Sequence, residues 1–201
     1  MSNSVEIQDN DAALAASAAK GDLDAFEALV NRHQKRLFNI AFRISGSLED
    51  AAEITQDAFV AAFRHIGSFK GEAKFSTWLT AIVINHAKNR LKQTRSRERR
   101  EAYSLDEPIR TEDGMLLPDP PSKGPSTLDR LEQRDRDKAV QDCINRLDQD
   151  FREVIVLRDM QDFSYDEIGN MLKVREGTVK SRLSRAREAV KECLKKVLGN
   201  I

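Results

Sequence analysis

The stretch "FSYDEIGNMLKVREGTVKSRLSRAREAVKECLKKVL", residues 163–198, decides the fold. Ser164 and Glu167 have the spacing of a capping box, in which two side chains satisfy the first free amides of a helix. Apolar residues at 168, 171 and 172 make the short helix that follows amphipathic, and "KVREG" then turns the chain. A longer helix is predicted to begin near Glu176. This order of elements is typical of a helix-turn-helix.

The two sides of the predicted last helix differ in chemistry. One side is apolar and consists of Val179, Leu183, Ala186, Val190, Leu194 and Val197. The opposite side is polar and consists of Ser181, Ser184, Arg185 and Glu188, flanked by Lys180, Arg182 and Arg187. A helix that enters the major groove needs an apolar back, hydrogen-bonding side chains in front and cations at its edges. The pattern therefore predicts DNA recognition by this helix.

The alternative is a solvated helix laced with salt bridges. Residues 173–196 hold nine basic residues against three acids, so internal pairing cannot absorb the charge. We expect Lys180, Ser181 and Arg185 to contact base edges or the nearest phosphates, and Thr178 to touch the DNA backbone from the helix start. The other cations are expected to add nonspecific, salt-sensitive attraction: Arg182, Arg187 and Lys191.

Charge is segregated along the 201 residues, although 33 basic and 33 acidic residues sum to zero. Residues 1–30 carry six acids and one lysine, whereas residues 88–100 carry seven basic residues against one glutamate. A second basic tract is the one at 173–196. The net charge therefore does not argue against a nucleic-acid partner.

All five prolines fall within eighteen residues, in "SLDEPIRTEDGMLLPDPPSKGPS" at 104–126. Proline removes helix donors and glycine adds backbone freedom, so we expect a flexible, Pro/Gly-rich acidic linker over 97–125. Two small domains flank it, at about residues 10–96 and 126–199. Both have helical periodicity and neither has convincing strand alternation, which predicts an all-α fold.

Three helices are expected in the first domain. The first carries an apolar stripe that ends at "SGS", residues 45–47: Phe26, Val30, His33, Leu37, Ile40 and Ile44. On this stripe His33 is interpreted as a core or boundary histidine with a satisfied partner, with a ligand as the alternative. The second helix, about residues 49–66, is expected to bury Phe59, Phe63 and Ile66, and the third to begin near Ser76.

The first domain then ends in "DAAEITQDAFVAAFRHIGSFKGEAKFSTWLTAIVINHAKNRLK", residues 50–92. Together with "LDQDFREVIVLRDMQDFSYDEIGNMLKVREGTVKSRLSRAREAV", residues 147–190, this block closely resembles the extracytoplasmic-function (ECF) sigma factors of bacterial RNA polymerase. The resemblance covers both domains in order. It implies that the first domain is sigma region 2, which binds core polymerase and opens the minus-10 element. The second domain would be region 4, which docks on the minus-35 element.

The resemblance also implies residue roles. Residues 69–74, with Phe69, Lys70 and Lys74, look like the family's specificity loop, and Asn85 and Asn89 match its base-reading amides. The cations expected to hold phosphates are Lys88, Arg90 and Lys92. Phe75 and Trp78 would add aromatic surface, since an unstacked base needs a partner for stacking. The alternative is that Phe75 and Trp78 are core, with Trp78 supporting the pocket from below.

Four polar residues on the second helix match the family's surface for the largest polymerase subunit: Asp50, Glu53, Gln56 and Asp57. The helix dipole alone would account for one or two acids at a helix start. The resemblance further implies an anti-sigma partner, often membrane-bound.

Other function classes lack their signals. No Ser/His/Asp set, phosphate loop or metal-ligand spacing is present, so we expect no catalytic residue, metal or cofactor. Cys143 and Cys193 are isolated, and each is expected to be a small buried helix residue, with a redox role as the alternative. Without an export signal or membrane span the protein is expected to stay in the cytoplasm. A DNA-binding regulator that acts without polymerase remains the rival interpretation.

Overall fold

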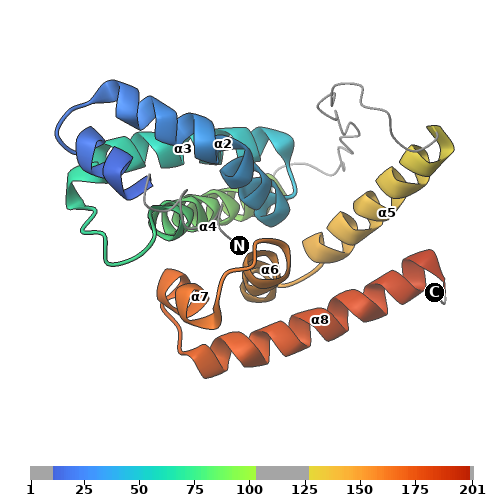
Figure 1. Cartoon of the computed structure of the whole chain (residues 1–201). Helices are drawn as coiled ribbons and strands as arrows, with labels where there is room; N and C mark the ends of the chain where they lie inside the picture. The colour runs from blue at the N-terminus through green and yellow to red at the C-terminus, as the bar shows by residue number, and fades with distance from the viewer. Residues whose placement is uncertain (1–10, 103–126, 200–201) are drawn as a thin grey trace.

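The computed structural model describes residues 11–102 and 127–199 (Figure 1). Every regular element in this part of the chain is helical, which confirms the predicted all-α class. Residues 11–18 form a first short helix. The elements that follow are α2 (Leu23–Ser45), α3 (Leu48–His65), η1 (Ile66–Ser68), α4 (Phe75–Ala102), α5 (Thr127–Asn145), α6 (Gln149–Ile155), η2 (Val156–Met160), α7 (Tyr165–Leu172) and α8 (Glu176–Leu198). Helices α2–α4 form a first bundle and α5–α8 a second.

The predicted linker begins in helix. Residues 97–102 belong to α4, so the helix runs past the position where proline and glycine were expected to end regular structure. The first proline is Pro108, and nothing before it stops a helix. The rest of the predicted linker, residues 103–125, lies outside the described residues.

The first bundle is built from capped helices. The Asp22 side chain accepts a hydrogen bond from the Ala25 amide at 3.0 Å and starts α2. Gly46 ends α2 with a φ of 78°, and the Ser47 hydroxyl accepts from the Asp50 amide at 3.2 Å to start α3. The core between the helices consists mainly of Leu29, Leu37, Ile40, Ile44, Ile54, Leu79, Val83 and Ile84.

Phe63 is an exception to the predicted core. Its side chain is 47% exposed, and its ring contacts Phe26 edge-on at 5.0 Å on the surface of the bundle. Small residues, Ala58 and Ala62, take the buried side of α3 instead. The prediction that His33 is a satisfied core residue is confirmed, since His33 is buried with Nε2 2.8 Å from Asp11 Oδ2.

The predicted helix-turn-helix is confirmed. The Ser164 amide donates to Glu167 Oε2 at 2.9 Å and the Glu167 amide donates to Ser164 Oγ at 3.2 Å, which completes the capping box. Lys173 ends α7 in the left-handed region, and α8 begins at Glu176. The N-terminal part of the apolar stripe of α8 is buried, at Val179, Leu183 and Ala186. Its last member, Val197, was predicted to be on the packed side but is 47% exposed near the end of α8.

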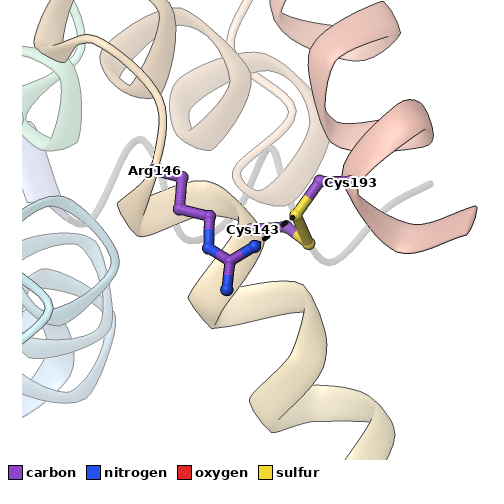
Figure 2. The surroundings of a disulfide bond; sticks show 3 residues. All are labelled: Cys143, Arg146 and Cys193. Atoms are coloured by element: carbon purple, nitrogen blue, oxygen red, sulfur yellow. Dashed lines mark hydrogen bonds between the residues drawn. A yellow bond between two sulfur atoms is a disulfide. The ribbon is translucent and has the colours of Figure 1, made fainter. Parts of the chain in front are cut away.

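The prediction that the two cysteines are isolated is wrong. Helices α5 and α8 run side by side (Figure 1), and a disulfide joins Cys143 of α5 to Cys193 of α8 (Figure 2). The two residues are 50 apart in sequence, and sequence spacing alone does not reveal that their helices are neighbours. Cys143 is buried as expected, whereas Cys193 is only partly buried.

Within the described ranges, each helix is too short or too polar to cross a membrane.

Replacing Gly169 tests the tight turn between α7 and α8. A Cβ at Gly169 would lie 2.9 Å from the backbone oxygen of Val174, so Gly169→Ala must push the turn apart. We expect a loss of roughly 1–3 kcal/mol in the free energy of unfolding, measured with urea. Gly177→Ala is the matched control, since nothing lies within 4 Å of a Cβ there. Equal stability of the two variants would contradict this account of the turn.

Candidate nucleic-acid interface

Three aromatic rings meet where the loop after α3 leads into α4. The centroids of Phe69, Phe75 and Trp78 are 5.4–5.6 Å apart in all three pairs. Phe75 is 3% exposed and belongs to the core, whereas Phe69 and Trp78 are partly buried. The core alternative for Phe75 is therefore correct, and Phe75 supports the two rings that reach the surface.

A hollow of about 380 Å³ lies beside Trp78, between α3 and α4. Its lining consists of Ala61, His65, Ser68, Trp78, Ile82, Asn85 and His86. Trp78 and Asn85 are seven residues apart, two helical turns, so they share one side of α4. Asn89 and Lys92 follow on that side at steps of four and three residues, and both are exposed. An aromatic face and an amide thus meet in one concave site.

Three predicted DNA cations of the first bundle contact carboxylates instead. Lys74 Nζ lies 4.0 Å from Glu167 Oε1, and Lys88 Nζ lies 3.0 Å from Glu153 Oε2, both in the second bundle. Arg90 contacts two of the acids predicted to bind polymerase, with its guanidinium 2.7 Å from Asp50 and from Glu53. Lys70, Gln56 and Asp57 are exposed.

The front of α8 has the predicted arrangement of side chains. Ser181, Ser184, Arg185 and Glu188 are all exposed. Arg185 has no hydrogen bond or ion pair with any residue in the described part of the chain. Thr178 is partly buried, and its carbonyl accepts from the Ser181 hydroxyl at 3.0 Å. Considering only residues 11–102 and 127–199, the helix therefore offers small polar groups and one cation without an ion pair in front.

The flanking cations of α8 are paired with acids. Arg182 lies 2.5 Å from Asp150 of α6, and Arg187 makes two contacts of 2.6 and 2.9 Å to Asp159 of η2. Lys180 contacts Glu176 and also lies over the Tyr165 ring at 5.3 Å. Sequence analysis missed the partners in α6 and η2 because they are far apart in sequence from α8. Only the pair of Lys180 with Glu176 could be predicted from the sequence, because the two residues are four apart on one helix.

Polar contacts join the two bundles. Arg36 donates to the side chain and backbone of Gln161 at 3.0 Å each, and Arg43 donates to Gln141 at 2.7 Å. Arg152, itself buried, donates to the Ile44 carbonyl at 2.7 Å. An interface rich in charged and amide groups resembles the contacts between domains that can separate.

Glu153 is the most constrained of the interface carboxylates. Its side chain is 1% exposed, with the Gln149 amide 2.9 Å from Oε1 and Lys88 beside Oε2. Burial raises the pKa of Glu153 above its ordinary value of 4.5, although Gln149 and Lys88 act in the opposite direction. The charged form of Glu153 therefore destabilises the folded protein at the interface between the two bundles.

Two family models match the chain. The model for Sigma-70 region 2 matches residues 29–97, and the model for Sigma-70, region 4 matches residues 137–190. The chain is 34% identical over 193 residues to the RNA polymerase sigma-H factor of Pseudomonas aeruginosa, covering 95% of this chain and 97% of that protein. It is 32% identical to the ECF RNA polymerase sigma factor SigW of Bacillus subtilis, covering 88% and 92%.

This chain is an ECF sigma factor. It directs transcription initiation by RNA polymerase, and its family is not enzymatic. The family assignment replaces the rival interpretation of a regulator that acts without polymerase. A solved structure with a similar fold is the sigma factor RpoE in complex with the anti-sigma factor NepR from Bartonella quintana, at a TM-score of 0.63 and 26% identity, covering 85% of this sigma factor and 96% of that chain.

Among residues 11–102 and 127–199, no group of three or more His, Cys, Asp or Glu side chains is arranged to hold a metal ion.

Neutralising Glu153 should stabilise this sigma factor at neutral pH. A carboxyl whose pKa is raised by folding loses stability as the pH rises above its ordinary value of 4.5. Glu153→Gln keeps the shape and removes the charge, so we expect the midpoint of thermal unfolding to rise by about 3 °C at pH 8, roughly 1 kcal/mol. At pH 4 the difference should vanish.

The control is Glu188→Gln, which removes an exposed carboxylate paired with Lys191 at 3.5 Å. It should shift the midpoint by about 1 °C or less. A lower midpoint for Glu153→Gln at pH 8 would show that the ion pair with Lys88 outweighs the cost of burial.

Proposed function

We propose that this sigma factor opens the minus-10 element with the hollow between α3 and α4, and docks on the minus-35 element with the front of α8. Region 2 would extend over about residues 10–96 and region 4 over about 126–199, with the acidic, Pro/Gly-rich segment between them as a linker. The observation that carries the proposal is the shared lining of the hollow by Trp78 and Asn85.

Strand opening requires a place for an unstacked base. Stacking on an aromatic ring is worth roughly 1–3 kcal/mol per base, and extruding a base costs a few kcal/mol. Trp78 supplies the aromatic surface of the hollow with Phe69 packed against it, and Asn85 supplies an amide that can read a base edge. Asn89 and Lys92 continue along the same side of α4 toward the adjoining nucleotides, and Lys70 adds a cation from the loop.

The minus-35 contact follows from the groups in front of α8. Arg185 is the best candidate for a base edge because it is exposed and unpaired among the described residues. Ser181 and Ser184 leave room for close approach to the groove, with Lys180 and Thr178 next to them. Arg182 and Arg187 are already neutralised in part by acids of the same domain, so they add less attraction to phosphates than their charge suggests.

We propose that core polymerase binds the polar side of α3. Asp50 and Glu53 contact Arg90. Gln56 and Asp57 are already exposed, so they can bind polymerase without any rearrangement. A basic polymerase surface would compete with Arg90 for the two acids. Released in this way, Arg90 becomes available to phosphate, and separation of the bundles releases Lys74 and Lys88 in the same way.

An anti-sigma factor is the second proposed partner, and it can be membrane-bound. The support is the solved relative RpoE, whose structure holds the anti-sigma factor NepR. The sigma factor itself is proposed to act in the cytoplasm, where core polymerase works. No part of the proposal requires a cofactor or metal.

Run-off transcription with purified core polymerase tests the division of roles. With Asn85→Ala we expect minus-35 binding to persist and opening to fall about tenfold, read by permanganate reactivity of thymines, because one amide contact to a base is worth roughly 1–3 kcal/mol. Gln93→Ala is the matched control, since Gln93 is an exposed amide of α4 outside the hollow. Unchanged opening in Asn85→Ala would refute the assignment of the hollow.

Affinity for a minus-35 duplex tests the pairing of the α8 cations. Arg185→Ala should weaken holoenzyme binding by about tenfold and relax the preference for the minus-35 bases, because a base-edge contact is lost. Arg187→Ala should have a smaller effect, because Arg187 is paired with Asp159 before DNA binds. The same loss in both variants would show that the pair with Asp159 opens freely.

A further inference from the structure

The disulfide between Cys143 and Cys193 lies away from the proposed promoter contacts. Cys143 is 1% exposed near the end of α5, and Cys193 is partly exposed in the second half of α8. Their Cα atoms are 5.7 Å apart, within the range that a disulfide requires. The packing of α5 against α8 therefore places two thiols in position for bond formation without a change of fold.

The two sulfur atoms have different surroundings. Figure 2 shows the Arg146 guanidinium beside the sulfur pair, with Nη1 3.8 Å from Cys193 Sγ. The neighbouring acid, Glu192, is paired with Lys195 at 3.2 Å and offsets this positive charge little. A cation beside a partly exposed cysteine favours the thiolate, which is the reactive form, whereas a cysteine buried among apolar groups reacts more slowly with an oxidant from solution. The surroundings therefore single out Cys193 for attack on an oxidant.

We propose that Cys193 and Cys143 form a redox modification site, with Cys193 as the attacking thiol, Cys143 as the resolving thiol and hydrogen peroxide as the oxidant. The Cys193 thiolate attacks one peroxide oxygen, the O–O bond breaks, and the leaving hydroxide takes a proton to form water. The product is a sulfenic acid at Cys193. The Cys143 sulfur then attacks the Cys193 sulfur, the S–O bond breaks, and hydroxide leaves with the Cys143 proton as a second water. Both sulfurs are oxidised and both peroxide oxygens are reduced.

The Cys143–Cys193 disulfide attaches the C-terminal part of α8 to α5. Apolar packing weakens along this helix, from Val179, which is fully buried, to Val197 and Leu198, which are 47% and 38% exposed. The disulfide lies in the weakly packed part and closes a loop that contains α6, η2, α7 and most of α8. Closing a loop of 50 residues stabilises the folded state by restricting the unfolded chain. Oxidation is therefore expected to stabilise the helix-turn-helix domain.

The site suits a reversible modification. Disulfides of cytoplasmic proteins are usually transient and often sense oxidants. The expectation that the disulfide is reversible rests on the proposed function in the cytoplasm. The thiol chemistry depends only on the residues around the two sulfur atoms. The readouts below are chemical modification and unfolding, so their failure would leave the proposed promoter contacts standing.

The first experiment measures how the reduced full-length chain reacts with hydrogen peroxide. Differential alkylation and peptide mass spectrometry should show the Cys143–Cys193 disulfide. In Cys143→Ser we expect a sulfenic acid trapped by dimedone at Cys193. Because Cys143 is buried and its variant can misfold, brief peroxide exposure of the wild-type chain with dimedone gives a second test, with the adduct expected at Cys193 alone. An adduct mainly at Cys143, or no disulfide at all, would overturn the proposal.

The second experiment tests Arg146 as a positioning residue. Arg146→Gln should slow peroxide oxidation roughly fivefold, the effect of one exposed ion pair, and Arg146→Lys should restore most of the rate. Equal rates in all three proteins would remove Arg146 from the site. Finally, oxidised wild-type protein should unfold about 10 °C above the reduced protein, whereas Cys193→Ser should be insensitive to oxidant. Equal midpoints for the two wild-type forms would refute the stabilising role of the bond.

Discussion

The buried guanidinium of Arg152 is the contact on which the arrangement of the two bundles depends. It donates to the Ile44 carbonyl near the end of α2, to the Asn145 carbonyl at the end of α5 and to the Leu147 carbonyl in the turn before α6. Carbonyls at helix ends lack partners within their own helix and carry the negative end of the helix dipole. One cation therefore satisfies helix ends from both bundles. Gly46 leaves room for this junction, because a Cβ there would lie 2.8 Å from the Asn145 side chain.

Around this junction several contacts between the bundles are polar, and some of their groups also cap a helix or are proposed to bind DNA. Lys88 faces Glu153, and Lys74 and Thr77 face Glu167, which also closes the capping box of α7. Charged groups at such an interface can exchange a protein partner for phosphate or water at little net cost. The interface is thus compatible with bundles that pack together in the free chain and separate on a promoter.

Local signals in the sequence were sufficient for the helices and the helix-turn-helix. The capping box at Ser164 and the apolar stripes depend on residues within a few turns, so they could be predicted without a structure. The pairs of Arg182 with Asp150 and Arg187 with Asp159, and the joined cysteines, depend on which helices become neighbours. Phe63 was misplaced for a related reason, since an aromatic residue on a helical stripe can cover the bundle from outside. Family resemblance pointed to Trp78 and Asn85, which line the hollow, whereas the residues predicted for the specificity loop, 69–74, are not in its lining and the contribution of His65 and His86 was not predicted.

Trp78 is the only tryptophan of the chain, and it lies in the hollow between α3 and α4. Its indole is therefore a built-in spectroscopic probe of that hollow, without any dye or added label. A nucleobase that stacks on the ring would quench its emission, whereas events at α8 would leave the signal nearly unchanged. Polymerase contributes tryptophans of its own, so difference spectra against a Trp78→Phe chain would isolate this one fluorophore and time the capture of a base during initiation.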